Sequence, residues 1–155
     1  GYRVGAIVSN ENLLTEIEKF LDTTTICPSQ VGQFGALWGL RNLKEWVSEN
    51  RNRISKRRKY FQKEFYRLKK KGWDLLGIGS YFAYVSHPFN QTSYFICESL
   101  AKEQAVLALP GGMFNPTEYH QRTKQIRIAF ANIDCKEITE LIDRLVKFKG
   151  DLASQ

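Results

Sequence analysis

The chain has 155 residues, of which 43% are apolar, 13% aromatic and 25% charged, and its formal net charge is +7 at neutral pH. This length and apolar content are enough for a buried core and exclude a disordered chain. No apolar stretch approaches the roughly 20 residues of a membrane-spanning helix, so we expect no membrane association. Cys27, Cys97 and Cys135 form no metal-ligand pattern, and we expect reduced thiols in a cytoplasmic protein.

The first fifty residues predict one strand and two helices. The run 2–8 is strand-like, and Asn10 is placed to cap a helix whose apolar residues recur at helical spacing as far as Leu21. Pro28 suits the first position of a second helix. That helix carries small residues at Gly32, Gly35, Ala36 and Gly39. Since Gly costs roughly 1 kcal/mol relative to Ala inside a helix, we expect another backbone to pack against this face.

The rest of the chain predicts a long helix followed by a smaller mixed segment. The expected order is helix, strand, helix, two strands and a last helix, over residues 51–71, 80–85, 90–102, 105–109, 125–130 and 134–148. Asp134 and Glu137 have the spacing of a capping box. The polar stretch 48–50 is the expected boundary, which gives an α/β chain with domains at residues 1–49 and 50–155.

Two arginines are candidates for binding anions. Arg3 lies in a strand-like run between Gly1 and Gly5, where a ligand could approach the backbone closely and a guanidinium could hold a phosphate. Arg127 lies on a strand opposite Ile126 and Ile128, and its planar fork matches a carboxylate. The alternatives are a solvent-exposed Arg3, and an Arg127 that lies on an edge strand or in an internal ion pair.

The neighbouring motifs resemble a known family. Leu109-Pro110-Gly111-Gly112-Met113-Phe114 ends a strand in a Pro-Gly turn followed by an aromatic residue, which suits one wall of a pocket. This order, followed by Arg127 on a strand, is similar to the aspartate aminotransferase superfamily, whose members depend on pyridoxal 5′-phosphate (PLP). Gly1-Tyr2-Arg3-Val4-Gly5 resembles its phosphate-binding segment, and the runs 27–33 and 79–82 extend the resemblance over nearly the whole chain.

The resemblance implies the C-terminal portion of the PLP-dependent transferase fold (fold type I), with the end of the large domain and the small α/β domain. It implies an aminotransferase that moves an amino group between an amino acid and a 2-oxo acid, as a homodimer. Arg3 would bind the cofactor phosphate and Arg127 the substrate α-carboxylate. A lyase or decarboxylase of the same fold is the alternative, because fold alone does not separate these reactions.

The chain also departs from the family pattern. The Schiff-base lysine, the aspartate on the pyridine nitrogen and the residue near the ring oxygen would all lie upstream of residue 1. We therefore expect this chain alone to be inactive. Some relatives that prefer dicarboxylic substrates have a further arginine in the region that matches residues 22–26, and this chain has none there.

The predicted helix 51–71 suggests a competing function. It carries eleven Lys and Arg against one acid, Glu64, a charge of +10 that leaves −3 for the rest of the chain. With Tyr60, Tyr66 and Trp73 as stacking partners, it could bind nucleic acid. The preferred interpretation is a solvated helix face whose apolar stripe packs inward, because Ile54, Phe61, Phe65 and Leu68 have the spacing of such a stripe.

Overall fold

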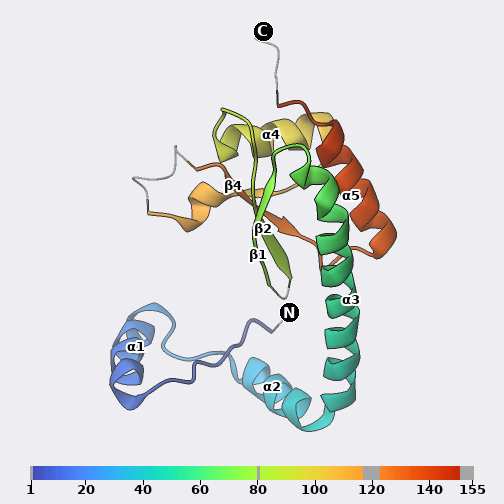
Figure 1. The fold of residues 1–155 in the computed structure, drawn as a ribbon. Coiled ribbons are helices and arrows are strands. Elements are labelled where there is room, and N and C mark those ends of the chain that lie inside the picture. The colour runs from blue at the N-terminus through green and yellow to red at the C-terminus, as the bar shows by residue number, and fades with distance from the viewer. Residues whose placement is uncertain (1, 80, 117–122, 151–155) are drawn as a thin grey trace. The chain divides into compact units, whose positions relative to one another are not determined.

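The computed structural model describes residues 2–79, 81–116 and 123–150. By its internal contacts the chain divides into two compact units, Gly1–Asn50 and Arg51–Gln155. Helix α3, Lys44–Lys69, contributes residues 44–50 to the first unit and residues 51–69 to the second. Figure 1 shows the helices and strands of each unit.

The first unit contains helix α1, Glu11–Thr24, and helix α2, Gln30–Asn42. As predicted, Asn10 caps α1, because its side-chain oxygen accepts from the Leu13 amide at 2.9 Å. Helix α2 begins later than Pro28, with Ser29 as its N-cap. The predicted strand at 2–8 does not form, since no described residue pairs with this segment, and an isolated extended segment gains no ladder hydrogen bonds.

The opening segment packs instead on the small face of α2. A Cβ atom added at Gly32 would lie 3.3 Å from the Tyr2 carbonyl oxygen and 3.5 Å from the Val4 Cβ. One added at Gly35 would lie 3.3 Å from the Tyr2 ring. The expectation that another backbone packs on this face is thus confirmed. The apolar residues of α1 recur at helical spacing, which predicts a buried face, but within the described chain α1 has no buried residue and this prediction is wrong.

Helix α3 also differs from its prediction. It begins at Lys44 and continues through residues 48–50, so the helix does not break at the predicted boundary, although the division between the two units falls at Asn50. That stretch is polar but contains neither Gly nor Pro, so nothing in it breaks the helical hydrogen bonds. The Asn50 side chain donates to the Trp46 carbonyl at 2.8 Å, and both residues stay within the helix.

The second unit is built on a four-stranded antiparallel sheet of order β1-β2-β4-β3. The strands are β1, Asp74–Ile78; β2, Phe82–Ser86; β3, Leu109–Pro110; and β4, Gln125–Ala129. The remaining elements are α4, Ser93–Gln104; the 3-10 helix η1, Gly111–Phe114; and α5, Cys135–Lys147. Helix α4 is capped by Thr92, not by Asn90 as its predicted start implied.

One continuous core joins the sheet to the helices of this unit. The sheet contributes alternate residues of β2 and β4, and the helices contribute one face each. The fully buried large side chains include Phe61, Leu68, Ile96, Leu100, Ile126, Ile128, Phe130, Ile138, Ile142 and Leu145. The capping box of Asp134 and Glu137 starts α5 as predicted. The apolar stripe of α3 is buried at Phe61, Phe65 and Leu68, also as predicted.

Two strand predictions need correction. Strand β1 is not predicted by the sequence, because Gly77 interrupts its short apolar run; in the structure Gly77 lies at an irregularity in the pairing of β1 with β2. Gly inside a strand often marks such a bulge. The predicted strand 105–109 is reduced to Leu109–Pro110, since Ala105 takes a left-handed conformation, φ 51°, that ends α4.

Candidate functional site

Arg127 lies on an interior strand of the sheet. Strand β4 runs between β2 and β3, where Arg127 is paired with Tyr84 on one side and Leu109 on the other. Its side chain is on the face opposite to Ile126 and Ile128, which are buried under the helices. The alternative of an arginine on an edge strand is therefore excluded.

Two aromatic rings hold the Arg127 guanidinium. Its central carbon, Cζ, lies 4.2 Å from the centre of the Phe82 ring and 4.5 Å from the centre of the Phe114 ring. Phe82 begins β2 and Phe114 ends η1, so the two rings come from opposite sides of β4. Stacking on ring faces leaves the N–H groups at the edge of the guanidinium available to an acceptor.

Arg127 has no acidic partner in the part of the chain that the structure describes. Each of the ion pairs found there joins other residues. Within these limits the alternative of an internal ion pair has no support. A half-buried guanidinium with free N–H donors is a binding position for an anion, and a carboxylate matches it with two parallel hydrogen bonds.

The Pro-Gly turn packs against the same face of the sheet. A Cβ atom at Gly111 would lie 2.6 Å from the Gln125 carbonyl oxygen and 2.6 Å from the Tyr84 hydroxyl, so only glycine fits. Burial raises the pKa of the Tyr84 hydroxyl above its usual value. The turn, Tyr84 and Arg127 thus lie close together on one face. Sequence alone did not single out Phe82 or Tyr84, because it does not give the register between β2 and β4.

Arg3 lies in the first unit, on the segment that packs against α2. Its backbone is left-handed, φ 56°, and its side chain is exposed. Among the described residues it forms no ion pair. A Cβ atom at Gly5 would meet nothing within 4 Å, so the backbone there is open to a ligand. Arg3 and Arg127 therefore form two separate candidate anion positions, one in each unit.

The basic part of α3 is mostly a solvated face. Arg67 forms ion pairs with Asp143 and Glu64, and Arg57 donates to the Ala131 carbonyl. Two of the three proposed stacking partners are not available, because Trp73 is buried and the Tyr60 hydroxyl is 2.8 Å from the Thr139 hydroxyl. Tyr66 is exposed but has the Lys70 ammonium 4.6 Å from its ring centre. The nucleic-acid hypothesis loses support.

Two other features are absent from residues 2–79, 81–116 and 123–150. No group of three His, Cys, Asp or Glu residues there could hold a metal ion. None of the described helices is long and apolar enough to cross a membrane.

Comparison with known proteins identifies the family. The chain matches the sequence profile of the family "Aminotransferase class I and II" over residues 1–145. That match covers nearly the whole sequence, and the chain therefore belongs to the class I and II aminotransferases. It is similar to the aspartate aminotransferase of Thermotoga maritima, with 30% identity over 148 residues, 96% of this chain and 36% of that enzyme. The chain thus spans about a third of the length of this relative.

Solved structures agree on the fold. An archaeal alanine:glyoxylate aminotransferase matches with a TM-score of 0.72 at 19% identity, over 95% of this chain and 36% of that one. A PLP-dependent aminotransferase from Streptococcus suis matches with a TM-score of 0.69 at 18% identity, over 95% of this chain and 37% of that one. An α-aminoadipate aminotransferase from Thermus thermophilus matches with a TM-score of 0.71 at 18% identity, over 90% of this chain and 36% of that one. Its structure was solved with N-(5′-phosphopyridoxyl)-L-leucine. The chain has part of the α/β fold of PLP-dependent aminotransferases.

Proposed function

We propose that this chain is part of a PLP-dependent aminotransferase that moves an amino group between an amino acid and a 2-oxo acid. Arg127 binds the α-carboxylate of the substrate, and Arg3 binds the phosphate of the cofactor. The observation that carries the proposal is the Arg127 guanidinium, held by Phe82 and Phe114 on an interior strand without an acidic partner in the described chain. Family membership supplies the reaction class.

Arg127 has the properties that a carboxylate anchor needs. Its side chain is half-buried, which strengthens a charge-assisted hydrogen bond relative to one in water. The two aromatic contacts restrict the guanidinium before a substrate arrives, and this lowers the entropy lost on binding. A substrate held by two parallel hydrogen bonds has a fixed α-carbon, which favours removal of its α-proton in one orientation.

The phosphate is the only group of PLP for which we propose a binding residue in this chain. Arg3 is exposed, next to the open backbone at Gly5, and without an ion pair in the described chain, all of which suit a phosphate dianion. When bound, PLP supplies an electron sink for the substrate carbanion. No residue of this chain is proposed as the Schiff-base lysine. The proposal therefore includes that this chain alone does not transaminate.

Three further properties belong to the proposal. A lyase or decarboxylase of the same fold remains the alternative reaction, although family membership favours amino transfer. A homodimer is proposed, and exposed apolar side chains of the first unit, such as Phe34 and Trp38, are consistent with further protein contacts. A cytoplasmic location is proposed from the cysteines, which are free in the described structure.

The test compares the chain with a hybrid protein. In the hybrid, this chain replaces the matching 148 residues of the Thermotoga maritima aspartate aminotransferase. PLP binding is followed by the absorbance of the bound cofactor, and amino acids are then added. We expect an amino-acid-responsive band in the hybrid and not in the chain alone, whose surface lysines can react with the aldehyde without responding to amino acids.

The phosphate role is tested in the same hybrid. We expect Arg3→Gln to weaken PLP binding by roughly tenfold or more, because a charge-assisted contact to phosphate is lost. The matched control is Arg58→Gln, which removes an exposed arginine of α3. A hybrid that folds, shown by its circular dichroism, and binds PLP equally well with Arg3→Gln would contradict the role of Arg3.

A further inference from the structure

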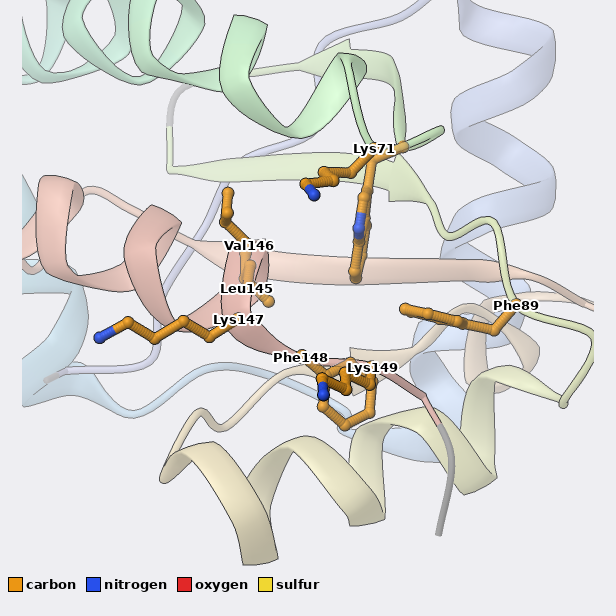
Figure 2. Close-up of a pocket in the computed structure, with 8 residues that line it drawn as sticks. Lys71, Phe89, Leu145, Val146, Lys147, Phe148 and Lys149 are labelled. Atoms are coloured by element: carbon orange, nitrogen blue, oxygen red, sulfur yellow. The ribbon is translucent and has the colours of Figure 1, made fainter.

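The second unit contains a cavity on the helix-covered side of its sheet, away from the face that carries Arg127. The cavity has a volume of about 450 Å³, which is within the range of small-molecule sites. Its lining comes from the turn after α3, the loop after β2 and the end of α5 (Figure 2). The lining residues are Lys71, Trp73, Phe89, Leu145, Val146, Lys147, Phe148 and Lys149.

The inner wall of the cavity is aromatic. The Phe89 ring lies edge-on to Trp73, with ring centres 5.8 Å apart, and edge-on to Phe148, with ring centres 5.3 Å apart. Trp73, Phe148 and Leu145 are buried and form an apolar floor, while Phe89 is half-buried. A flat apolar group of a ligand would be covered on several sides by these rings.

The rim of the cavity is positively charged. Lys71, Lys147 and Lys149 are exposed, and the lining residues include no Asp or Glu. In Figure 2, Lys71 and Lys149 lie beside the labelled apolar side chains, whereas the amino group of Lys147 extends away from them. The C-terminal ends of α3 and α5 lie near these residues and bring roughly half a negative charge each. The ammonium groups of Lys71 and Lys149 outweigh these two half charges, so the opening favours an anion.

We propose that this cavity is a second ligand site, which takes a small aromatic carboxylate. The aromatic group lies against Phe89, Trp73 and Phe148, and the carboxylate pairs with Lys71 and Lys149. A ligand of one ring with a short acidic chain suits the combination of an apolar floor and a cationic rim at this volume. This site is independent of the proposed Arg127 anchor, because its lining residues lie on the other side of the sheet.

The test uses 3-phenylpropionate and its neutral counterpart 3-phenylpropanamide, which differ only in the charged group. Each is titrated into the millimolar range with the complete chain, labelled with ¹⁵N, and the indole N–H signals of the tryptophans are recorded by NMR. The chain has three tryptophans, and only Trp73 lines the cavity. We expect the acid to move the Trp73 signal saturably and to bind at least about threefold more tightly than the amide. The Trp38 and Trp46 signals should stay in place.

Two variants separate charge from apolar contact. The double variant Lys71→Gln and Lys149→Gln should lower affinity for the acid by roughly fivefold and leave affinity for the amide unchanged. The matched control, Lys56→Gln and Lys63→Gln, removes the same charge from exposed positions of α3 and should change neither. Absence of a saturable Trp73 shift with the acid would overturn the proposal. So would equal affinities for acid and amide with no effect of the Lys71 and Lys149 substitutions.

Discussion

The guanidinium of Arg127 stacks on the ring of Phe82, with its Cζ atom 4.2 Å from the ring centre. Arg127 is on β4 and Phe82 is on β2, where Phe82 is paired with Ala129, two residues beyond Arg127. The contact is therefore a diagonal one across neighbouring strands, within reach of long side chains. It fixes the arginine by a group that does not neutralise its charge, which leaves that charge available to a ligand.

The coupling between these two residues can be measured directly. A double-mutant cycle of Phe82→Leu and Arg127→Gln should give a coupling free energy of about 0.5–1 kcal/mol, as for other partly exposed cation–π pairs. The measurement is urea unfolding followed by NMR signals of the second unit. Strictly additive effects of the two substitutions would show that the stacking does not stabilise the unit.

The Pro-Gly turn should not tolerate a side chain at Gly111. In Gly111→Ala, the new methyl group would meet the Gln125 carbonyl and the Tyr84 hydroxyl, so we expect a loss of about 1–3 kcal/mol in the free energy of unfolding. Gly77→Ala is the matched control, because a Cβ atom there meets nothing within 4 Å. Equal stability of the two variants in urea unfolding would contradict the close packing described here.

The capping box at the start of α5 should raise the free energy of unfolding by about 1 kcal/mol. Asp134 accepts from the Glu137 amide at 2.8 Å, and the Glu137 carboxylate accepts from the Asp134 amide at 2.7 Å. Asp134→Ala removes the first bond, and we expect the free energy of unfolding to fall by about 0.5–2 kcal/mol. Lys136→Ala, at an exposed position in the same turn, is the control and should change the stability little.

Stability of the second unit should fall in mild acid because of His87. This side chain is 2% exposed, and neither ring nitrogen has a hydrogen-bond partner in the described chain. Burial, together with the charge of Lys124, lowers the pKa of His87 from 6.5 to about 4, while the main chain of Phe89 opposes this only weakly. As the pH falls, His87 therefore binds a proton near pH 6.5 in the unfolded chain but only near pH 4 in the folded chain.

The sign of that effect follows from proton binding. The unfolded state binds more protons between these two pKa values, so stability is complete above pH 6.5 and falls as the pH decreases toward 4. The loss between pH 7 and pH 4 should reach about 3 kcal/mol. His87→Phe keeps an aromatic ring beside Trp73 and Phe89 and removes the titrating group. If this variant loses stability over the same pH range as steeply as the original chain, His87 is not the cause.

Local patterns predicted the elements that carry strong periodicity or capping signals. The stripe Phe61, Phe65 and Leu68 repeats at helical spacing, and the structure buries it. The Asn10 cap and the capping box at Asp134 were also predictable, since capping depends on neighbours within one turn. The glycines of α2 indicated a close backbone contact. Glycine destabilises a helix, and such a contact compensates for that loss of stability.

Features that depend on distant residues were missed. The segment 2–8 is rich in strand-forming residues, but strand formation needs a pairing partner, and no described residue supplies one. Arg127 was identified as a candidate anchor and Phe114 as part of a pocket wall, yet Phe82 was not, because its position beside Arg127 depends on the register of β2 with β4. Sequence periodicity gives the face of a residue but not its neighbour across the sheet.

The central claim is that Arg127 binds the substrate carboxylate, and steady-state kinetics of the hybrid aminotransferase with Arg127→Gln and Arg127→Lys test it most directly. We predict that Arg127→Gln lowers kcat/KM for the amino acid by roughly a hundredfold, with Arg127→Lys in between, because lysine keeps the charge but not the paired hydrogen bonds. PLP binding should be unchanged in both. An Arg127→Gln hybrid that binds PLP and keeps kcat/KM within about twofold of the unsubstituted hybrid would contradict the account.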